Sequence, residues 1–144
     1  MERILDYPQF WLIPYAAAAW LSGRILPVGA LPTLGWAVVL AGLALMAVAA
    51  WTMMRAGATV DPTKQPTALV THGVFSRSRN PIYLGDAVIL AGLCLIWQPL
   101  AVIVLVPLFV RTLTRRFIRR EEAWLRARDP AAFDAWAAGT RRWL

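Results

Sequence analysis

The chain has 144 residues, of which 59% are hydrophobic, and its formal net charge is +7. A soluble domain of this length is nearer half apolar. The excess here lies in long runs, which excludes an ordinary soluble domain and favours a single integral membrane domain. Nucleic-acid binding is excluded too, because the basic residues border apolar runs and no stacking-plus-basic module is visible.

The first part of the chain, residues 1–54, predicts two transmembrane helices. The apolar run 10–26 is just long enough to span a membrane, and a turn rich in proline and glycine follows it. The run 34–54 carries no charge, and Trp36 and Trp51 lie near its ends, where aromatic belts form. The N-terminus lacks the pattern of a cleaved signal peptide, so none is expected.

Residues 55–80 predict a cytoplasmic loop that is long for so small a protein. Three X-Pro pairs break regular structure in it, and apolar residues such as Leu69 and Phe75 are mixed with polar ones. A loop of this length in a compact domain is functional or disordered. The mixture favours an ordered segment at the membrane interface.

Residues 81–118 predict a helical hairpin, and residues 119–144 predict cytoplasmic helices. The runs 82–97 and 100–110 are short for full spans, and Gln98-Pro99 turns the chain between them. The second helix is expected to continue as 111–128 and to stop at Asp129-Pro130. An interfacial helix follows, with Phe133, Trp136 and Trp143 as expected membrane anchors. The predicted fold is therefore all-α and polytopic, with about four transmembrane helices.

The placement of lysine and arginine predicts the orientation. Nine arginines lie between residues 111 and 142, and four basic residues lie between residues 55 and 79. Cytoplasmic segments of membrane proteins carry this bias, with anionic lipids as the counter-charge. Both regions and both chain ends are therefore expected on the cytoplasmic side of a multi-pass cell (inner) membrane.

Two polar blocks flank the predicted hairpin and are the segments suited to chemistry. In the first block, Asn80 is expected to cap the helix that Pro81 begins, and the positive helix N-terminus suits an anionic ligand group. Tyr83 offers a hydroxyl, and Gly85 permits close approach of a helix or a ligand. The same residues are also typical of a plain helix start with an interfacial tyrosine.

In the second block, Glu121 and Glu122 point to different faces of a helix. Glu122 is expected to pair with Arg119 and Arg126, three and four residues away. Glu121 has no such partner in the helix and is the candidate to bind a ligand ammonium. The alternative is a solvated run of charges.

Three other residues carry side chains that are suited to chemistry. Asp86 is expected one turn inside the third helix, where an acid is either functional or simply favoured by the helix dipole. His72 and Cys94 lack the partners that a metal needs, so no metal is expected. From the residues alone we expect a small membrane protein with a ligand site at its cytoplasmic face, and no particular reaction.

At the two polar blocks the chain resembles the isoprenylcysteine carboxyl methyltransferase family, which is related to the small phospholipid methyltransferases. The resemblance covers residues 57–144. The matching positions, in order, are Leu69-Val70-Thr71, Gly73, Phe75, Arg79-Asn80-Pro81, Tyr83, Gly85, Glu121-Glu122, Leu125, Phe133, Trp136 and Arg142.

This resemblance implies methyl transfer from S-adenosylmethionine to a lipophilic acceptor that enters from the lipid side. Glu121 would bind the ammonium of the cofactor, the Asn80-Pro81 helix start its carboxylate, and Phe75 its adenosine. The implied cofactor contacts are Thr67, Ala68, Leu69, Val70, Phe75, Asn80, Pro81, Ile82, Tyr83 and Glu121.

Two positions depart from the eukaryotic members of the family. Asn80 stands in place of a histidine, and Phe117 stands where those members place an arginine near the substrate. The adjacent Arg116 is the candidate replacement, and with Glu121 it is a candidate catalytic residue. A shift of one residue, however, rotates a side chain by about 100° around a helix.

Two alternatives to this function stay open. One is amine methylation of a phospholipid headgroup, which needs a base or an acidic binding group such as Asp86. The other is a non-enzymatic membrane scaffold or ligand-binding protein. The composition, rich in Ala, Arg and Trp, suggests a bacterial origin, for which a prenyl-like or other lipidic small molecule is a suitable acceptor.

Overall fold

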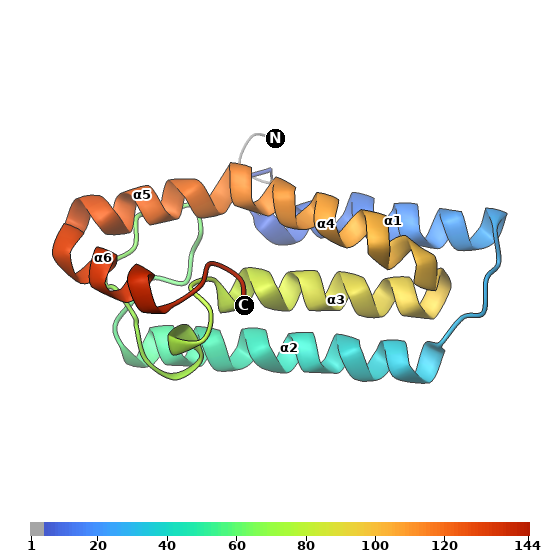
Figure 1. The fold of residues 1–144 in the computed structure, drawn as a ribbon, viewed down its shortest axis with the longest axis horizontal. Helices are drawn as coiled ribbons and strands as arrows, with labels where there is room; N and C mark the ends of the chain where they lie inside the picture. Colours follow the sequence, from blue (N-terminus) through green and yellow to red (C-terminus); the bar gives the residue numbers. More distant parts are fainter. Residues whose placement is uncertain (1–4) are drawn as a thin grey trace.

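A computed structural model describes residues 5–144 and shows helices and no strands over that range (Figure 1). The predicted all-α fold is therefore confirmed for this part of the chain. Four helices lie side by side in an elongated bundle: α1 (Pro8–Ile25), α2 (Pro32–Arg55), α3 (Pro81–Trp97) and α4 (Val102–Leu113).

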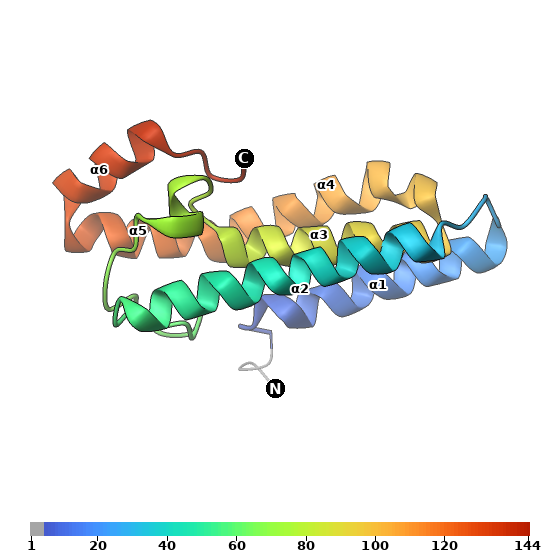
Figure 2. The same cartoon turned by 90° about the horizontal axis from the view of Figure 1, so that it is seen from below.

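The last two helices extend the molecule beyond one end of this bundle. Helices α5 (Arg119–Arg128) and α6 (Pro130–Gly139) lie there beside the 56–80 loop, which contains a 3₁₀ turn at Gly73–Ser76 (Figures 1 and 2). The polar parts of the chain are thus gathered at one end, as the sequence predicts.

Prolines mark where most of the helices begin. Pro8, Pro32, Pro81 and Pro130 each lie in the first turn of a helix. A proline is suited to this position because its missing N–H would have no intrahelical partner there. Asp129 caps α6, since its side chain accepts a hydrogen bond from Ala132 N at 3.0 Å.

Helix α4 runs into α5 as one long rod, as expected for the second hairpin helix (Figure 1). The junction is a π-helical turn over Thr114–Ile118. Such turns are rare and widen the helix locally, which changes the direction of every side chain that follows. The rod ends at Arg128, before the predicted stop at Asp129-Pro130.

Helix α2 is, among the described residues, the one helix long and apolar enough to cross a membrane by itself. Helix α3 is apolar but shorter, and α4 has only 12 residues. About 20 residues are needed for a full span. Membrane insertion through α2 agrees with the sequence, while the four-span topology stays a prediction.

Helices α2 and α3 approach each other closely through glycines. Gly42 faces Gly85, and a β-carbon on Gly42 would lie 2.8 Å from the Gly85 carbonyl oxygen. Gly35 faces Gly92 in the same manner, with a distance of 2.7 Å from a β-carbon on Gly92 to the Gly35 carbonyl oxygen. Small residues let membrane helices pack backbone to backbone. The close approach allowed by Gly85 is therefore to another helix.

Candidate functional site

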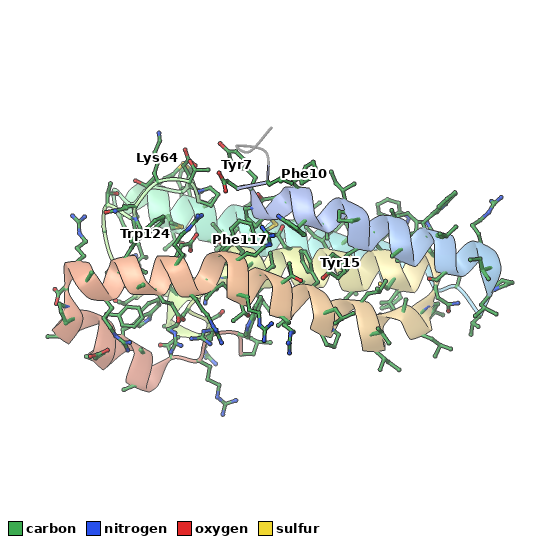
Figure 3. All side chains as sticks on the ribbon, turned by 90° about the horizontal axis from the view of Figure 1, so that it is seen from above. Tyr7, Phe10, Tyr15, Lys64, Phe117 and Trp124 are labelled. Atoms are coloured by element: carbon green, nitrogen blue, oxygen red, sulfur yellow. The ribbon has the colours of Figure 1, made fainter. Side chains whose placement is uncertain are left out.

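A cavity of about 580 Å³ lies at the polar end of the bundle. Its wall comes from the start of α1, the end of α2, the 59–70 part of the loop, the start of α3, and helices α5 and α6. Figure 3 shows Lys64 of the loop and Trp124 of α5 toward one end of the molecule, with Tyr7, which precedes α1, further along the long axis. A volume of this size suits a cofactor or a small ligand.

The structure brings most of the implied cofactor residues around this one cavity. Their individual roles in binding stay predictions. The lining residues among them are Ala68, Leu69, Val70, Phe75, Asn80, Pro81, Ile82, Tyr83 and Glu121.

Thr67 is the implied cofactor residue that the structure places outside the cavity wall. Its hydroxyl accepts a hydrogen bond from Thr59 N and donates one to the Gly57 carbonyl, both at 2.9 Å. These bonds close the loop on itself. Arg120 and Arg128 of α5 also donate to loop carbonyls, so polar contacts hold the loop against α5. Its predicted packing at the membrane interface stays a prediction.

Glu121 lies in the cavity wall and is held by a residue of α3. The Tyr83 hydroxyl donates a short hydrogen bond to Glu121 Oε1. The Tyr83 ring in turn stacks on Phe117, with 6.3 Å between the ring centroids. Burial raises the pKa of Glu121 to about 7, although the Tyr83 hydrogen bond and the charge of Arg120 act in the opposite direction. A carboxylate poised near neutral pH is typical of a binding or catalytic group.

Glu122 pairs differently from the prediction. Its partners are Arg142, with Nη2 to Oε2 at 2.6 Å, and Arg79, with Nη2 to Oε1 at 3.2 Å. The expected partner Arg126 binds Asp134 instead, at 2.8 Å. The helix-local prediction was wrong because the fold brings α5, the segment before α3 and the C-terminal segment together. Glu122 thereby connects three distant parts of the chain.

Asn80 also belongs to this connection. It precedes α3 as predicted, but its side chain makes no cap; Nδ2 donates to the Arg142 carbonyl at 3.0 Å. The predicted capping role was therefore wrong. The preceding Arg79 donates from its backbone N to the Arg141 carbonyl at 2.9 Å. The C-terminal segment thus holds the start of α3 in place beside the cavity.

We expect Glu122→Gln to lower the melting temperature in a pH-dependent way. Burial raises the pKa of Glu122, but the hydrogen bond and charge of Arg142, together with Arg79, outweigh burial and bring it below 4.5. The stabilisation is therefore full above pH 4.5 and is lost as pH falls through the lower, folded pKa. At pH 7 the loss is about 1–2 kcal/mol, or roughly 2–6 °C.

Thermal unfolding in detergent, followed by circular dichroism from pH 7 to about pH 3, measures this effect. Asp134→Asn is the matched control, since the Asp134–Arg126 pair is largely exposed and such pairs contribute little. A difference between Glu122→Gln and wild type that stays constant with pH would contradict the ionic role of Glu122.

Two aromatic residues of α6 lie against the protein, where membrane anchors were expected. Phe133 is 2% exposed, and the Trp136 indole N–H donates to the Phe75 carbonyl at 2.9 Å. Trp136 also lines the cavity. The anchor prediction was wrong for these two residues because α6 folds back over the 3₁₀ turn of the loop.

Arg116 does not line the cavity. Its guanidinium lies over the Trp11 ring of α1, 4.2 Å from the ring centroid, and it borders a separate shallow groove with Arg111 and Arg115. The π-helical turn directs Phe117 to Tyr83 and leaves Arg116 on the outer side. Its role toward an acceptor stays a prediction.

Gln9 and Asp86 contact each other beside the cavity, and the sequence does not predict this contact. Gln9 lines the cavity, and its Nε2 donates to Asp86 Oδ2 at 3.4 Å. Nothing in the sequence signals Gln9, which lies just before an apolar run. Asp86 was a candidate because of its depth in the helix.

The fold and the cavity define a small helical membrane protein with a ligand-sized site at one end of its bundle. Residues 31–128 match the family model of phospholipid methyltransferases, and the chain belongs to that family. No curated protein and no solved structure matches the chain. The family makes this protein a membrane methyltransferase. The match starts before α2, whereas the resemblance noted from the motifs starts at residue 57.

Proposed function

We propose that the protein transfers a methyl group from S-adenosylmethionine to a lipophilic acceptor at the cytoplasmic face of the membrane. The observation that carries this proposal is the cavity itself, in which Glu121 and Tyr83 meet apolar loop residues at the end of a membrane bundle. The arginine-rich polar end is proposed to face the cytoplasm, with both chain ends on that side.

The residues present fit this cofactor. A sulfonium cofactor that is also an amino acid needs an acidic group for its ammonium and an apolar slot for its adenosine. Glu121 supplies the first, and Leu69, Val70 and Phe75 line the cavity to supply the second. Arg79 and Lys64 also line it and offer positive charge for the carboxylate.

The protein is required mainly to position the reactants and exclude water. S-adenosylmethionine, when bound, supplies a methyl group that its positive sulfur already activates for displacement. Tyr83 fixes the Glu121 carboxylate by its hydrogen bond, and residues of the 59–70 part of the loop form one wall of the cavity. Holding the reactants aligned in a site closed to water accounts for much of such a rate enhancement.

The finer proposal is an isoprenylcysteine carboxyl methyltransferase-like acceptor, which rests on the motif resemblance. In that reading Arg116 would contact the acceptor. In the described structure Arg116 lies over Trp11 and does not line the cavity. No other arginine of α4 or of its π-helical turn lines the cavity either. This part of the proposal therefore rests on the motif resemblance alone.

Methyl-labelled S-adenosylmethionine tests the proposed function. The purified protein in mixed micelles with a bacterial lipid extract is expected to transfer label into the organic phase. Calorimetric titration of the cofactor into the same preparation is expected to show binding. A folded protein that neither binds the cofactor nor transfers label would overturn the proposal and favour a scaffold or other ligand-binding role.

A further inference from the structure

A second concave surface, the α1–α4 groove, is separate from the cavity. It has a volume of about 270 Å³, and none of its lining residues belongs to the cavity wall. The residues that line it are Tyr15, Leu108, Arg111, Thr112, Arg115 and Arg116. The proposed cofactor site leaves this groove and its three arginines unexplained.

Tyr15 and Thr112 form a fixed contact between the two helices of the groove. The Tyr15 hydroxyl lies 2.7 Å from Thr112 Oγ1, and the Thr112 hydroxyl donates to the Leu108 carbonyl at 3.0 Å. The Tyr15 ring also meets Phe109 edge-on, with 5.1 Å between the ring centroids. Because Thr112 uses its proton on Leu108, Tyr15 donates to Thr112. The arginine side chains are then the donors that a ligand in the groove would meet.

The π-helical turn brings a third arginine into this groove. Arg111 and Arg115 are four residues apart, which places them on one helix face. In a regular helix a side chain five residues on would point about 140° away from Arg111. The hydrogen bonds of a π turn join residues five apart and reduce this angle, so Arg116 also lines the groove.

No neighbouring acid balances the charge of these arginines. Within residues 5–144, none of the three forms an ion pair with a carboxylate, and all three are exposed. Like charges four residues apart on a helix repel each other. Arg116 is held over the Trp11 ring, which fixes the position of its charge and does not neutralise it. An anion in the groove would supply the missing counter-charge.

An apolar helix face continues from the groove along α4. Leu108 lines the groove, and Val104 precedes it by four residues on the same face; both side chains are exposed. Arg111 follows directly on the apolar run of α4. In a membrane that takes up this run, the arginines would lie at the level of the lipid headgroups. A basic groove beside an apolar face is complementary to a phospholipid with a negative headgroup.

We propose that the α1–α4 groove binds an anionic phospholipid, with its phosphate on the three arginines and an acyl chain along Val104 and Leu108. The planar guanidinium group suits phosphate because it donates two parallel hydrogen bonds to its oxygens. Basic pockets between membrane helices on the cytoplasmic side bind anionic headgroups in this manner. Such a lipid occupies no part of the cavity, so this site does not depend on the proposed methyl transfer.

Lipid retention by the purified protein tests this proposal. Wild-type protein in a neutral detergent is expected to retain one dioleoylphosphatidylglycerol in native mass spectrometry, under conditions that remove dioleoylphosphatidylcholine. The two lipids have the same tails, and the second has a headgroup without net charge. Glycerol 3-phosphate, which has a phosphate and no tails, is expected to bind far more weakly. Equally tight binding of glycerol 3-phosphate would overturn the lipid assignment in favour of a soluble phosphate.

Substitution of two groove arginines measures their contribution. Arg111→Gln combined with Arg115→Gln is expected to weaken phosphatidylglycerol binding about thirtyfold, as the product of two charge contacts of about fivefold each. The matched control is Arg55→Gln combined with Arg77→Gln. It removes the same charge from exposed arginines outside the groove and is expected to bind the lipid as wild type does.

Photolabelling locates the lipid on the wild-type protein, without any variant. A phosphatidylglycerol with a diazirine in one acyl chain is expected to label α4 around Val104 and Leu108. Excess unlabelled phosphatidylglycerol should prevent this labelling, and phosphatidylcholine should not. Equal retention of the two lipids, an equal loss of binding in both double variants, or competed label that is absent from α1 and α4 would each overturn the proposal.

Discussion

Replacing Glu121 with alanine is expected to lower the affinity for S-adenosylmethionine by about ten- to a hundredfold, the effect of losing one charge-assisted contact in a partly buried site. The variant removes the one cavity acid that Tyr83 holds in place. It also leaves the Tyr83 hydroxyl without its acceptor, so cofactor binding and methyl transfer should both fall. Calorimetric titration in detergent measures the affinity.

Asp134→Ala is the control. Asp134 lies at the same end of the molecule as Glu121, but it is exposed and pairs with Arg126. Wild-type affinity in Glu121→Ala, with an unchanged melting temperature, would remove Glu121 from the cofactor site.

The pH dependence of cofactor binding gives a second measure of the same residue. The pKa of Glu121 is raised to about 7 by burial, so a growing fraction is charged as pH rises through 7. Affinity should therefore increase from about pH 6 to about pH 7.5, and then level as the cofactor's own amino group begins to lose its proton. Tyr83, Arg120 and Glu122 are the other titratable or charged groups that act on Glu121.

Glu121→Gln cannot gain this charge, and its residual binding should stay flat over the lower part of that range. A rise of equal size in Glu121→Gln would assign the titration to another group.

The helices were largely predictable because their signals are local. Apolar runs and first-turn prolines predict where α1, α2 and α3 begin and end to within two residues, and Asp129-Pro130 predicts the break between α5 and α6. These features depend only on neighbouring residues and on the hydrophobicity of each run. The number of helices that cross the membrane is harder to predict. Apart from α2, the apolar helices are shorter than the roughly 20 residues that a full span needs.

The site was predictable as a set of residues but not as a set of contacts. Helical spacing predicts that Glu122 pairs with arginines of its own helix. Its observed partners are Arg79 and Arg142, which come from segments far from α5 in the chain. Arg116 is predicted to replace the family's substrate arginine because it is adjacent to Phe117 in the sequence. In the structure it lies within the π-helical turn and its guanidinium is over Trp11. Neither long-range pairing nor a π turn leaves a periodic signal in a single sequence.

Enlarging a glycine at the α2–α3 contact is expected to have the largest effect on stability. Gly92→Leu should lower the melting temperature by roughly 5–10 °C, because overpacking of this kind costs about 3 kcal/mol or more. A β-carbon on Gly92 would lie 2.7 Å from the Gly35 carbonyl oxygen and 2.8 Å from Val39 N, and backbone atoms cannot move aside alone. The two helices would have to separate.

The consequence extends to the cavity, since α2 supplies Met46, Ala50 and Met53 to its wall. A displaced α2 should weaken cofactor binding even though Gly92 lies far along α3 from Glu121. The control is Gly139→Leu near the end of α6, where a β-carbon would meet nothing within 4 Å. Circular dichroism melts of both variants in one detergent decide the point: equal melting temperatures would mean that α2 and α3 do not pack through their glycines.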